Sequence, residues 1–235
     1  MQAPQPITEF FKGRFIAGPE QLQERYARIK AYVFDWDGVF NDGYKNDAGS
    51  SPFSELDAMG TNLLRFSHHL RTGVNPVFAI ISGEKNEAAF ALARRECFHA
   101  VYFRIKHKAG ALEHLAASHG LAAHEVSFVF DDVLDLSASK IAGLRTMVPH
   151  LSTSKLVEFC IREGLVDYVP AAPGGRHPVR ETCELLMTLG GQYDETVRHR
   201  SAFSPRYQEY LAERNAVRTQ FFTTDSTNSI QPAQV

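Results

Sequence analysis

Short apolar runs that stop at polar residues recur along this chain, and stretches of helical periodicity separate them. The apolar runs cover 29–34, 76–82 and 125–132, and the helical stretches cover 59–72, 85–95 and 109–119. Short apolar runs are typical of buried strands, whereas apolar residues at every third or fourth position are typical of amphipathic helices. Strands that alternate with helices form parallel sheets with right-handed crossovers. The expected fold class is therefore α/β, with a Rossmann-like parallel sheet flanked by helices.

Shorter patterns extend this sheet and add a loop beside it. Further strands are expected near Val101–Tyr102, Thr146–Val148 and Tyr168–Val169, with helices near 153–163 and 178–189. Residues 41–53 (NDGYKNDAGSSPF) are rich in Asn, Asp, Gly and Ser, a composition that predicts a β-hairpin. Because this hairpin follows the first strand, it should project over the sheet as a small flap. The expected fold contains no large cap domain.

The chain is expected to have three parts. Residues 1–28 form an N-terminal extension, residues 29–192 the α/β domain, and residues 193–235 a C-terminal helix and tail. Helical periodicity over 204–222 predicts the helix. The polar, low-complexity residues after Phe222 predict a disordered tail.

Composition excludes several classes of partner. The chain has 25 Lys and Arg and 27 Asp and Glu, for a formal net charge of −2. It has no cation surplus with which to neutralise a polyphosphate backbone, so nucleic acid is not an expected partner. No apolar run approaches the ~20 residues of a membrane helix, and no signal peptide is evident, so the expected location is the cytoplasm. Cys97, Cys160 and Cys183 lack CxxC spacing and are expected to be buried thiols.

Polar residues follow three of the expected strands. Asp35, Ser82 and Asp131 each fall at the carboxyl end of an apolar run. In an open parallel sheet, functional groups gather outside these ends, where the strand order reverses. Three separate loops are therefore expected to supply polar groups to one crevice.

The Asp35-Trp36-Asp37-Gly38 stretch carries the strongest chemical signal. Its two carboxylates are two residues apart on a nearly extended chain, so they can face the same region. Such a pair suits hydrolysis of a phosphate monoester in two displacements at phosphorus. Asp35 would be the nucleophile that forms an aspartyl phosphate. Asp37 would protonate the leaving alkoxide and then take a proton from the attacking water.

The same residues suit a magnesium ion. Mg²⁺ prefers oxygen ligands and offsets the repulsion between a carboxylate and an anionic phosphate. Asp35, the backbone carbonyl of Asp37, and Asp131 are expected to hold it. Ser82, with the amides near Gly83, can donate hydrogen bonds to phosphoryl oxygens, and Lys108 adds a positive charge.

Each of these signals also has an ordinary structural explanation. Asp35–Gly38 alone is compatible with a solvated turn, Ser82-Gly83 with a helix N-cap, and Lys106 and Lys108 with a solvated face. A calcium loop is excluded, because Val39 occupies a ligand position and Gly38 comes too early. The ten histidines contain no HExxH motif, so core or surface roles are expected for them.

Taken in order, the motifs resemble those of the haloacid dehalogenase superfamily. The similarity is greatest to the small tetrameric branch that contains the 3-deoxy-octulosonate 8-phosphate phosphatases and the nonulosonate 9-phosphate phosphatases. The resemblance spans roughly residues 29–189. The segments that carry it are VFDWDGVFNDG (33–43), DAMGTNLL (57–64), residues 108–144 and PGGRHPVRETCELL (173–186).

This resemblance implies a role for each site residue. It makes Asp35 the nucleophile, Asp37 the general acid and base, and Asp131 a metal ligand. Ser82, Gly83 and Lys108 would contact the phosphate, and Asp132 and Asp135 would bind metal-bound waters or orient Lys108. The PGGR segment would reach a neighbouring subunit of a tetramer, which makes Arg176 a substrate contact. The implied reaction is hydrolysis of a small sugar-acid phosphate in lipopolysaccharide or sialic acid biosynthesis.

Two positions depart from the branch, and a third distinguishes its members. Phe130 stands where Gly precedes the acidic pair, and His107 precedes Lys108 in place of Asp. These two departures leave open a catalytically degenerate oligomerisation or binding module. Glu84 stands where the octulosonate enzymes have Arg, as in the nonulosonate phosphatases, and would favour hydroxyl or amide donors on the substrate. A phosphatase for another small phosphometabolite is the third hypothesis.

Overall fold

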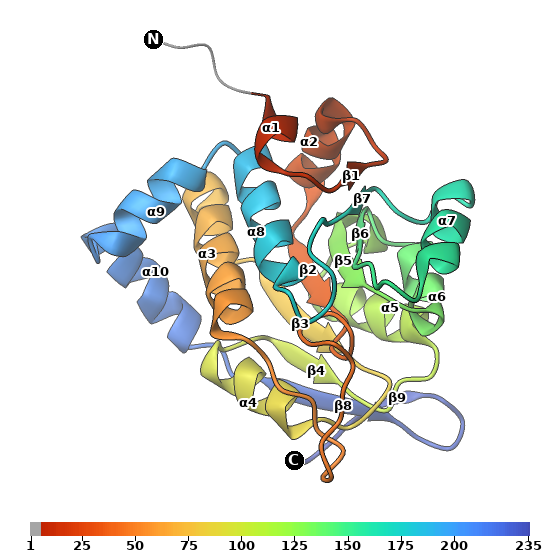
Figure 1. Ribbon diagram of the computed structural model, residues 1–235. Coiled ribbons are helices and arrows are strands. Elements are labelled where there is room, and N and C mark those ends of the chain that lie inside the picture. The colour runs from red at the N-terminus through yellow and green to blue at the C-terminus, as the bar shows by residue number, and fades with distance from the viewer. Residues whose placement is uncertain (1–5) are drawn as a thin grey trace.

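The structure is a computed structural model that describes residues 6–235, and its centre is one mixed, mostly parallel sheet (Figure 1). The strand order across the sheet is β1-β7-β6-β5-β2-β3-β4-β8-β9. The two outermost strands, β1 and β9, are antiparallel to their neighbours, and the other pairs are parallel. The strands are β1 (Arg14–Phe15), β2 (Ala31–Phe34), β3 (Val77–Ile81), β4 (Ala100–Tyr102), β5 (Val126–Phe130), β6 (Leu144–Met147), β7 (Tyr168–Val169), β8 (Gln220–Thr224) and β9 (Ile230–Pro232).

The central strands are apolar along their whole length because both faces of the sheet are covered. In β2, Tyr32 and Phe34 pack into one core cluster, whereas Ala31 and Val33 pack into the other. This alternation is the period-two geometry of a strand buried on both sides. The α/β prediction and its central parallel strands are confirmed.

Helices form a layer on each face of the sheet. Side chains of α2, α3, α4 and α8 share a core cluster on one face, and those of α5, α6 and α7 share the cluster on the other. Within the described residues, no helix is both long and apolar enough to cross a membrane. The helices are α1 (Ile7–Phe10), α2 (Pro19–Arg28), α3 (Glu55–Thr72), α4 (Glu87–Arg95), α5 (Lys108–Ser118), α6 (Leu136–Ser139), α7 (Ser154–Arg162), α8 (Pro178–Leu189), α9 (Tyr193–Ser201) and α10 (Pro205–Asn215), with short 3₁₀ turns at Ala123–Glu125 and Val133–Asp135.

The flap over residues 41–53 is a loop without strands, so the prediction of a β-hairpin is wrong. The loop projects from the carboxyl edge of the sheet, as Figure 1 shows. The Asn41 side chain accepts hydrogen bonds from the amides of Gly38 and Gly43, and the Asn46 side chain accepts from those of Ala48 and Ser50. Short polar side chains thus take the amide hydrogens that a strand ladder would need.

The C-terminal region differs from the prediction as well. The expected helix over 204–222 ends at Asn215, and a helix that was not expected, α9, precedes it. The prediction of disorder after Phe222 is wrong, because β8 pairs with β4 and β9 returns along β8. Phe221 packs against Phe90, and Phe222 stacks on Tyr102 at 4.9 Å. Aromatic anchors on a polar segment therefore complete the sheet edge.

The described part of the N-terminal extension belongs to the same sheet. Residues 1–5 lie outside the described part of the chain. Strand β1 pairs with β7, and α2 buries Leu22 and Tyr26 in the core. The three-part division of the chain remains a prediction.

Candidate active site

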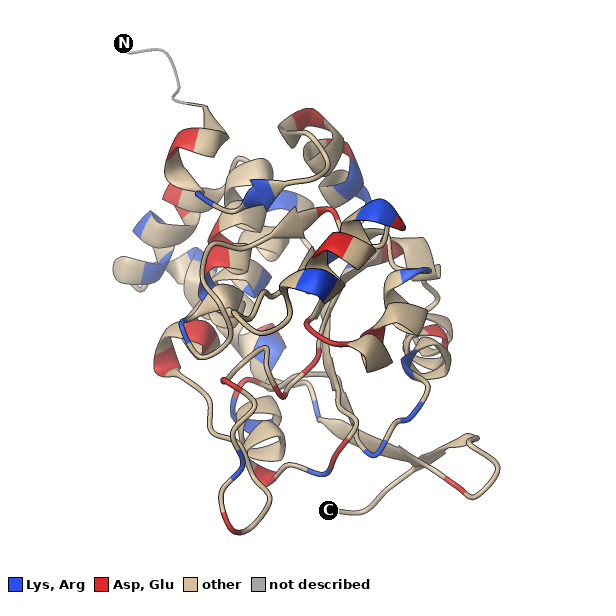
Figure 2. Cartoon of the chain, turned by 45° about the vertical axis from the view of Figure 1, so that its right-hand side comes forward, with Lys and Arg blue, Asp and Glu red and all other residues tan. Residues whose placement is uncertain are grey.

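A hollow of about 410 Å³ lies at the carboxyl ends of β2 and β5, on the edge where the polar residues were expected. Acidic segments from separate loops meet near the middle of the molecule in Figure 2. The hollow is lined by Asp35, Asp37, Gly38, Asp42, Gly43, Gly83, Glu84, Lys108, Asp131, Asp132, Leu134, Asp135, His150, Ser152 and Thr153. The sequence prediction of one crevice fed by several loops thus matches the structure.

Lys108 is the central cation of this hollow. Its ammonium lies 2.5 Å from a carboxylate oxygen of Asp35 and 2.5 Å from one of Asp135. Lys108 is 2% exposed, although it is the first residue of α5. Asp135 also accepts a hydrogen bond of 3.0 Å from the Asp132 amide, which fixes the acidic loop after β5. A buried charge requires such partners, so the solvated-face explanation of Lys108 is excluded.

Asp131 enters the hollow from the end of β5. Its Oδ2 lies 3.0 Å from Nε2 of His150, and its Oδ1 is buried with no hydrogen-bond partner among the described residues. Gly38 passes close above it with φ at +85°, and a Cβ there would come within 2.0 Å of Asp131 Oδ2. The glycine of the Asp-x-Asp-Gly motif is therefore required for both backbone conformation and close approach.

Burial and mutual repulsion alter the acidity of these groups. Burial raises the pKa of Asp35 well above its ordinary value, and the charge of Asp135 adds to this against the opposing effect of Lys108. Burial also raises the pKa of Asp131, although the hydrogen bond with His150 opposes it. Burial alone would lower the pKa of Lys108, but Asp35 and Asp135 outweigh it and hold that pKa above its ordinary value. The cluster has an excess of negative charge.

The donor set fits a hard divalent cation. One carboxylate oxygen from each of Asp35, Asp131 and Asp135 lies within 4.8 Å of the others, and all three residues are buried. Lys108 supplies one positive charge against three carboxylates. The unpartnered Oδ1 of Asp131 is the kind of oxygen that a cation such as Mg²⁺ would bind. These residues can therefore hold a magnesium ion.

Asp37 turns toward the flap and away from this cluster. Its Oδ2 accepts from the Lys45 ammonium at 2.8 Å, and its Oδ1 accepts a short hydrogen bond from the Ser51 hydroxyl. The role of the Asp37 backbone carbonyl as a metal ligand remains a prediction. Asp37 is nevertheless one of the residues that line the hollow.

The loop after β3 supplies the polar backbone expected of it. Ser82 is buried, and its hydroxyl oxygen accepts from the Glu84 amide at 3.2 Å. Gly83 and Glu84 line the hollow, whereas Ser82 lies behind them. The phosphate-contact role of Ser82 remains a prediction, and the structure brings its neighbours rather than Ser82 itself to the surface of the hollow.

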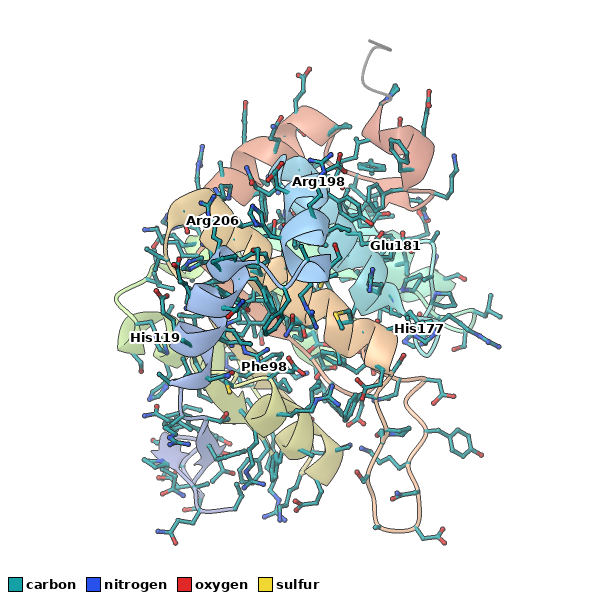
Figure 3. The ribbon with its side chains drawn as sticks, turned by 90° about the vertical axis from the view of Figure 1, so that its left-hand side faces the viewer. Phe98, His119, His177, Glu181, Arg198 and Arg206 are labelled. Atoms are coloured by element: carbon teal, nitrogen blue, oxygen red, sulfur yellow. The ribbon has the colours of Figure 1, made fainter. Side chains whose placement is uncertain are left out.

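Arg176 lies outside the acidic hollow. It is exposed and lines a separate depression beside the N-terminal segment. The next residue, His177, is labelled in Figure 3 at the start of α8. The preceding glycines do reach the flap, because a Cβ on Gly174 would come within 2.3 Å of the Gly38 carbonyl oxygen. Asp132 is exposed on the rim and caps the turn at Val133.

The two departures from the family pattern do not obstruct the hollow. Phe130 is 0% exposed and stacks on Phe128 at 5.6 Å, within the core on the α5 side of the sheet. His107 is exposed at the start of α5. Neither residue lines the hollow. Phe130 and His107 therefore give little support to the hypothesis of a catalytically degenerate module.

Sequence reasoning missed His150. The histidines were expected to have core or surface roles, yet His150 pairs with Asp131 inside the hollow. Its only sequence signal is its place shortly after β6, a strand of low apolar content. The hydrogen bond with Asp131 raises the pKa of His150 above its ordinary value, although burial opposes the rise.

Comparisons with known proteins agree with this geometry. No family model matches the chain. The 3-deoxy-D-manno-octulosonate 8-phosphate phosphatases KdsC of Salmonella typhi and of Escherichia coli K12 are each 28% identical over 171 residues, which cover 71% of this chain and 84% of the relative.

Solved structures give the same result. A hydrolase of haloacid dehalogenase subfamily III A from Legionella pneumophila superposes with a TM-score of 0.65 at 25% identity, covering 81% of this chain and 95% of that one. A probable YrbI family phosphatase from Pseudomonas syringae has a TM-score of 0.64 at 28% identity, covering 79% and 98%. The Moraxella catarrhalis octulosonate phosphatase, crystallised with magnesium, phosphate and KDO, shares the fold at 24% identity, with a TM-score of 0.63 over 76% and 97%.

The parallel sheet, the buried Asp–Lys–Asp cluster at its carboxyl edge and these similarities support a phosphoric monoester hydrolase that resembles the phosphatases of the haloacid dehalogenase superfamily. Within that superfamily, the similarity is to the KdsC and YrbI type: the relatives at 28% identity are named KdsC phosphatases, and the structure neighbours include a probable YrbI family phosphatase. The resemblance found from the sequence is confirmed.

Proposed function

We propose that this protein is a Mg²⁺-dependent phosphatase that hydrolyses a phosphate monoester of a small sugar acid through an aspartyl phosphate. The observation that carries the proposal is the buried arrangement in which Lys108 contacts both Asp35 and Asp135, with Asp131 beside them. A buried cluster of charged groups that line a hollow is typical of a catalytic site, because burying charge costs free energy.

The first displacement uses Asp35 and Asp37. A carboxylate oxygen of Asp35 forms a bond to phosphorus while the bond from phosphorus to the substrate alkoxide breaks, and Asp37 gives its proton to that alkoxide. Lys108 contacts Asp35 and can stabilise the transferred phosphoryl oxygens. When bound by Asp35, Asp131 and the Asp37 carbonyl, Mg²⁺ supplies positive charge that offsets the phosphate anion.

The second displacement releases phosphate. Water attacks phosphorus, Asp37 takes the proton of that water, and the bond between phosphorus and Asp35 breaks. Hydrogen bonds from Lys45 and Ser51 orient the Asp37 carboxylate at the base of the flap. The flap is thereby linked to the residue that handles both protons.

Three features support the substrate class. The matched relatives are named octulosonate 8-phosphate phosphatases, and the match covers 84% of their length. Glu84 lines the hollow, where a carboxylate would favour hydroxyl or amide donors, as on an octulosonate 8-phosphate or nonulosonate 9-phosphate. Arg176 is exposed and can pair with a substrate carboxylate if the PGGR segment serves a neighbouring subunit of a homotetramer in the cytoplasm.

The test is phosphate release from a panel of sugar-acid, sugar and nucleotide monophosphates with Mg²⁺ or with EDTA. We expect turnover with Mg²⁺, greatest on a sugar-acid phosphate, and its loss in EDTA with recovery on adding Mg²⁺. Asp35→Asn should lose activity by at least about a thousandfold while remaining folded, because the amide is not a competent nucleophile. Asp47→Asn, in the exposed part of the flap, is the matched control.

Each result bears on a different part of the proposal. Substantial turnover by Asp35→Asn would exclude the aspartyl-phosphate route. Activity that is indifferent to EDTA would exclude the metal. Preference for a nucleotide or a neutral sugar phosphate would replace the substrate class and leave the chemistry in place.

A further inference from the structure

His150 is held on three sides at the edge of the acidic hollow. Its Nε2 lies 3.0 Å from Asp131 Oδ2. A Cβ on Gly38 would come within 3.1 Å of that same nitrogen, and a Cβ on Gly174 within 2.3 Å of His150 Cε1. The backbone of His150 is fixed as well, because its amide donates to the Thr153 hydroxyl at 3.3 Å. The imidazole therefore has little freedom to turn.

This arrangement gives the two oxygens of Asp131 different environments. His150 occupies Oδ2, whereas Oδ1 is buried and has no hydrogen-bond partner among the described residues. A lone pair that is buried without a partner costs free energy unless something binds it. The nearest acidic groups, Asp35 and Asp135, share one cation in Lys108. Asp131 thus belongs to a cluster of three carboxylates with Lys108 as the neighbouring cation.

We propose that His150 is a positioning residue that fixes Asp131 so that Oδ1 is presented to the metal ion. The inference rests on the proposed function, because it assumes that Asp131 binds a metal. The imidazole donates its Nε2 hydrogen to Oδ2, which holds the carboxylate plane and leaves Oδ1 free. A hydrogen bond from outside the ligand set is a common way to orient a metal ligand, and its loss typically weakens metal binding 10- to 100-fold.

Two glycines, Gly38 and Gly174, leave the space that His150 and Asp131 occupy. Gly38 leaves room for Asp131 and His150 from the motif that carries the nucleophile, and Gly174 leaves room for the imidazole from the PGGR segment. The Gly174 amide also donates to the Pro149 carbonyl at 3.3 Å, next to His150. The PGGR segment thus has a role within its own subunit, because Gly174 packs against the imidazole that orients Asp131.

The test is Mg²⁺ binding measured by calorimetry on the metal-free full-length protein. We expect the Kd of His150→Ala to rise about 10- to 100-fold. His150→Gln, whose amide can also donate, should recover part of the loss. His124→Ala is the matched control, because that histidine is exposed on the 3₁₀ turn before β5, at the opposite end of that strand from the acidic loop. Circular dichroism of the metal-free variants checks that each is folded.

A double variant separates positioning from a general structural effect. Once Asp131→Asn has removed the carboxylate, adding His150→Ala should cost little more affinity, because the two changes remove one device. Equal Mg²⁺ affinity of wild type and both folded His150 variants would overturn the inference, as would fully additive losses. If wild-type protein fails to bind Mg²⁺ at all, the proposed function fails first, so the two failures are distinguishable.

Discussion

The two ends of the sheet carry hollows of nearly equal size and different chemistry. The acidic hollow at the carboxyl ends measures about 410 Å³, and a second hollow at the amino ends measures about 430 Å³. The second, here called the histidine hollow, is lined in part by His68, His99 and His119, and none of its described lining residues is acidic. Figure 3 places His119 on one side of the molecule and His177, beside the flap, on the other.

Charge, rather than volume, separates these two hollows. Burial lowers the pKa of His68 and of His99 to about 3, so both imidazoles are neutral at neutral pH. His68 meets the Tyr32 hydroxyl at 3.0 Å, and His99 accepts the Phe78 amide at 3.1 Å. Neutral groups with such partners can be buried at low cost. The acidic hollow instead keeps an ammonium and several carboxylates out of water, which a stable core alone does not require.

The largest expected effect comes from removing Lys108, the only Lys or Arg among the described residues that line the acidic hollow. Lys108→Met keeps the length of the side chain but leaves Asp35 and Asp135 without their partner. Turnover with Mg²⁺ should fall by about a thousandfold or more, because the phosphoryl group loses a fixed charge. Steady-state kinetics on the best substrate measures this loss.

The unfolding free energy of the same variant should fall in the metal-free protein. The expected loss is about 3 kcal/mol, the usual effect of breaking a buried ion pair. Lys106→Met, exposed two residues earlier, is the matched control and should change neither quantity. A Lys108→Met protein with near-normal turnover would show that the acidic hollow is no more catalytic than the histidine hollow.

A smaller effect is expected at Arg176, which lies on the site side of the sheet but outside the acidic hollow. Arg176→Ala or Arg176→Lys should raise KM for a sugar-acid phosphate about 10- to 100-fold, because a bidentate contact with a carboxylate is lost. Hydrolysis of p-nitrophenyl phosphate, which has no such carboxylate, should change little. Unchanged kinetics on the sugar acid, or an active monomer in solution, would refute the shared-site role of Arg176.

The sequence predicted the parts of this fold that depend on local pattern. Apolar runs predicted β2, β3 and β5 because both faces of those strands are buried. Strand β8 was missed, since QFFTT is mostly half-exposed and is held by aromatic contacts to distant residues such as Phe90 and Tyr102. A half-exposed strand next to the sheet edge leaves little pattern in its own sequence.

The same limit applies to the site. Asp35 and Lys108 were proposed because their motifs have a fixed order along the chain, and the structure places them in contact. His150 has no motif: it meets Asp131 only because β5 and β6 are neighbours in the sheet. Likewise, the sequence did not show that Arg176 would lie apart from the acidic hollow. Contacts between loops depend on strand order, which no short segment encodes.

The smallest expected effect belongs to the histidine hollow and concerns stability alone. Unfolded His68 titrates near pH 6.5, whereas in the folded protein its pKa is about 3, because it is buried. Between these values only the unfolded chain binds the proton, so stability is lost as the pH falls below 6.5. At pH 5 this amounts to about 2 kcal/mol for one histidine.

His68→Gln should therefore lose about 2 kcal/mol less stability than wild type between pH 7 and pH 5, and its turnover at pH 7 should be unchanged. Urea unfolding in EDTA at both pH values measures the difference. The raised pKa values of Asp35 and Asp131 act in the opposite direction, since acid favours their protonated folded forms, but they are common to both proteins and cancel. His124→Gln, exposed on the surface, should keep the wild-type pH dependence. If His68→Gln also keeps the wild-type pH dependence of stability, the imidazole of His68 is not buried as a neutral group. Lost turnover in His68→Gln would mean that the two ends of the sheet are coupled.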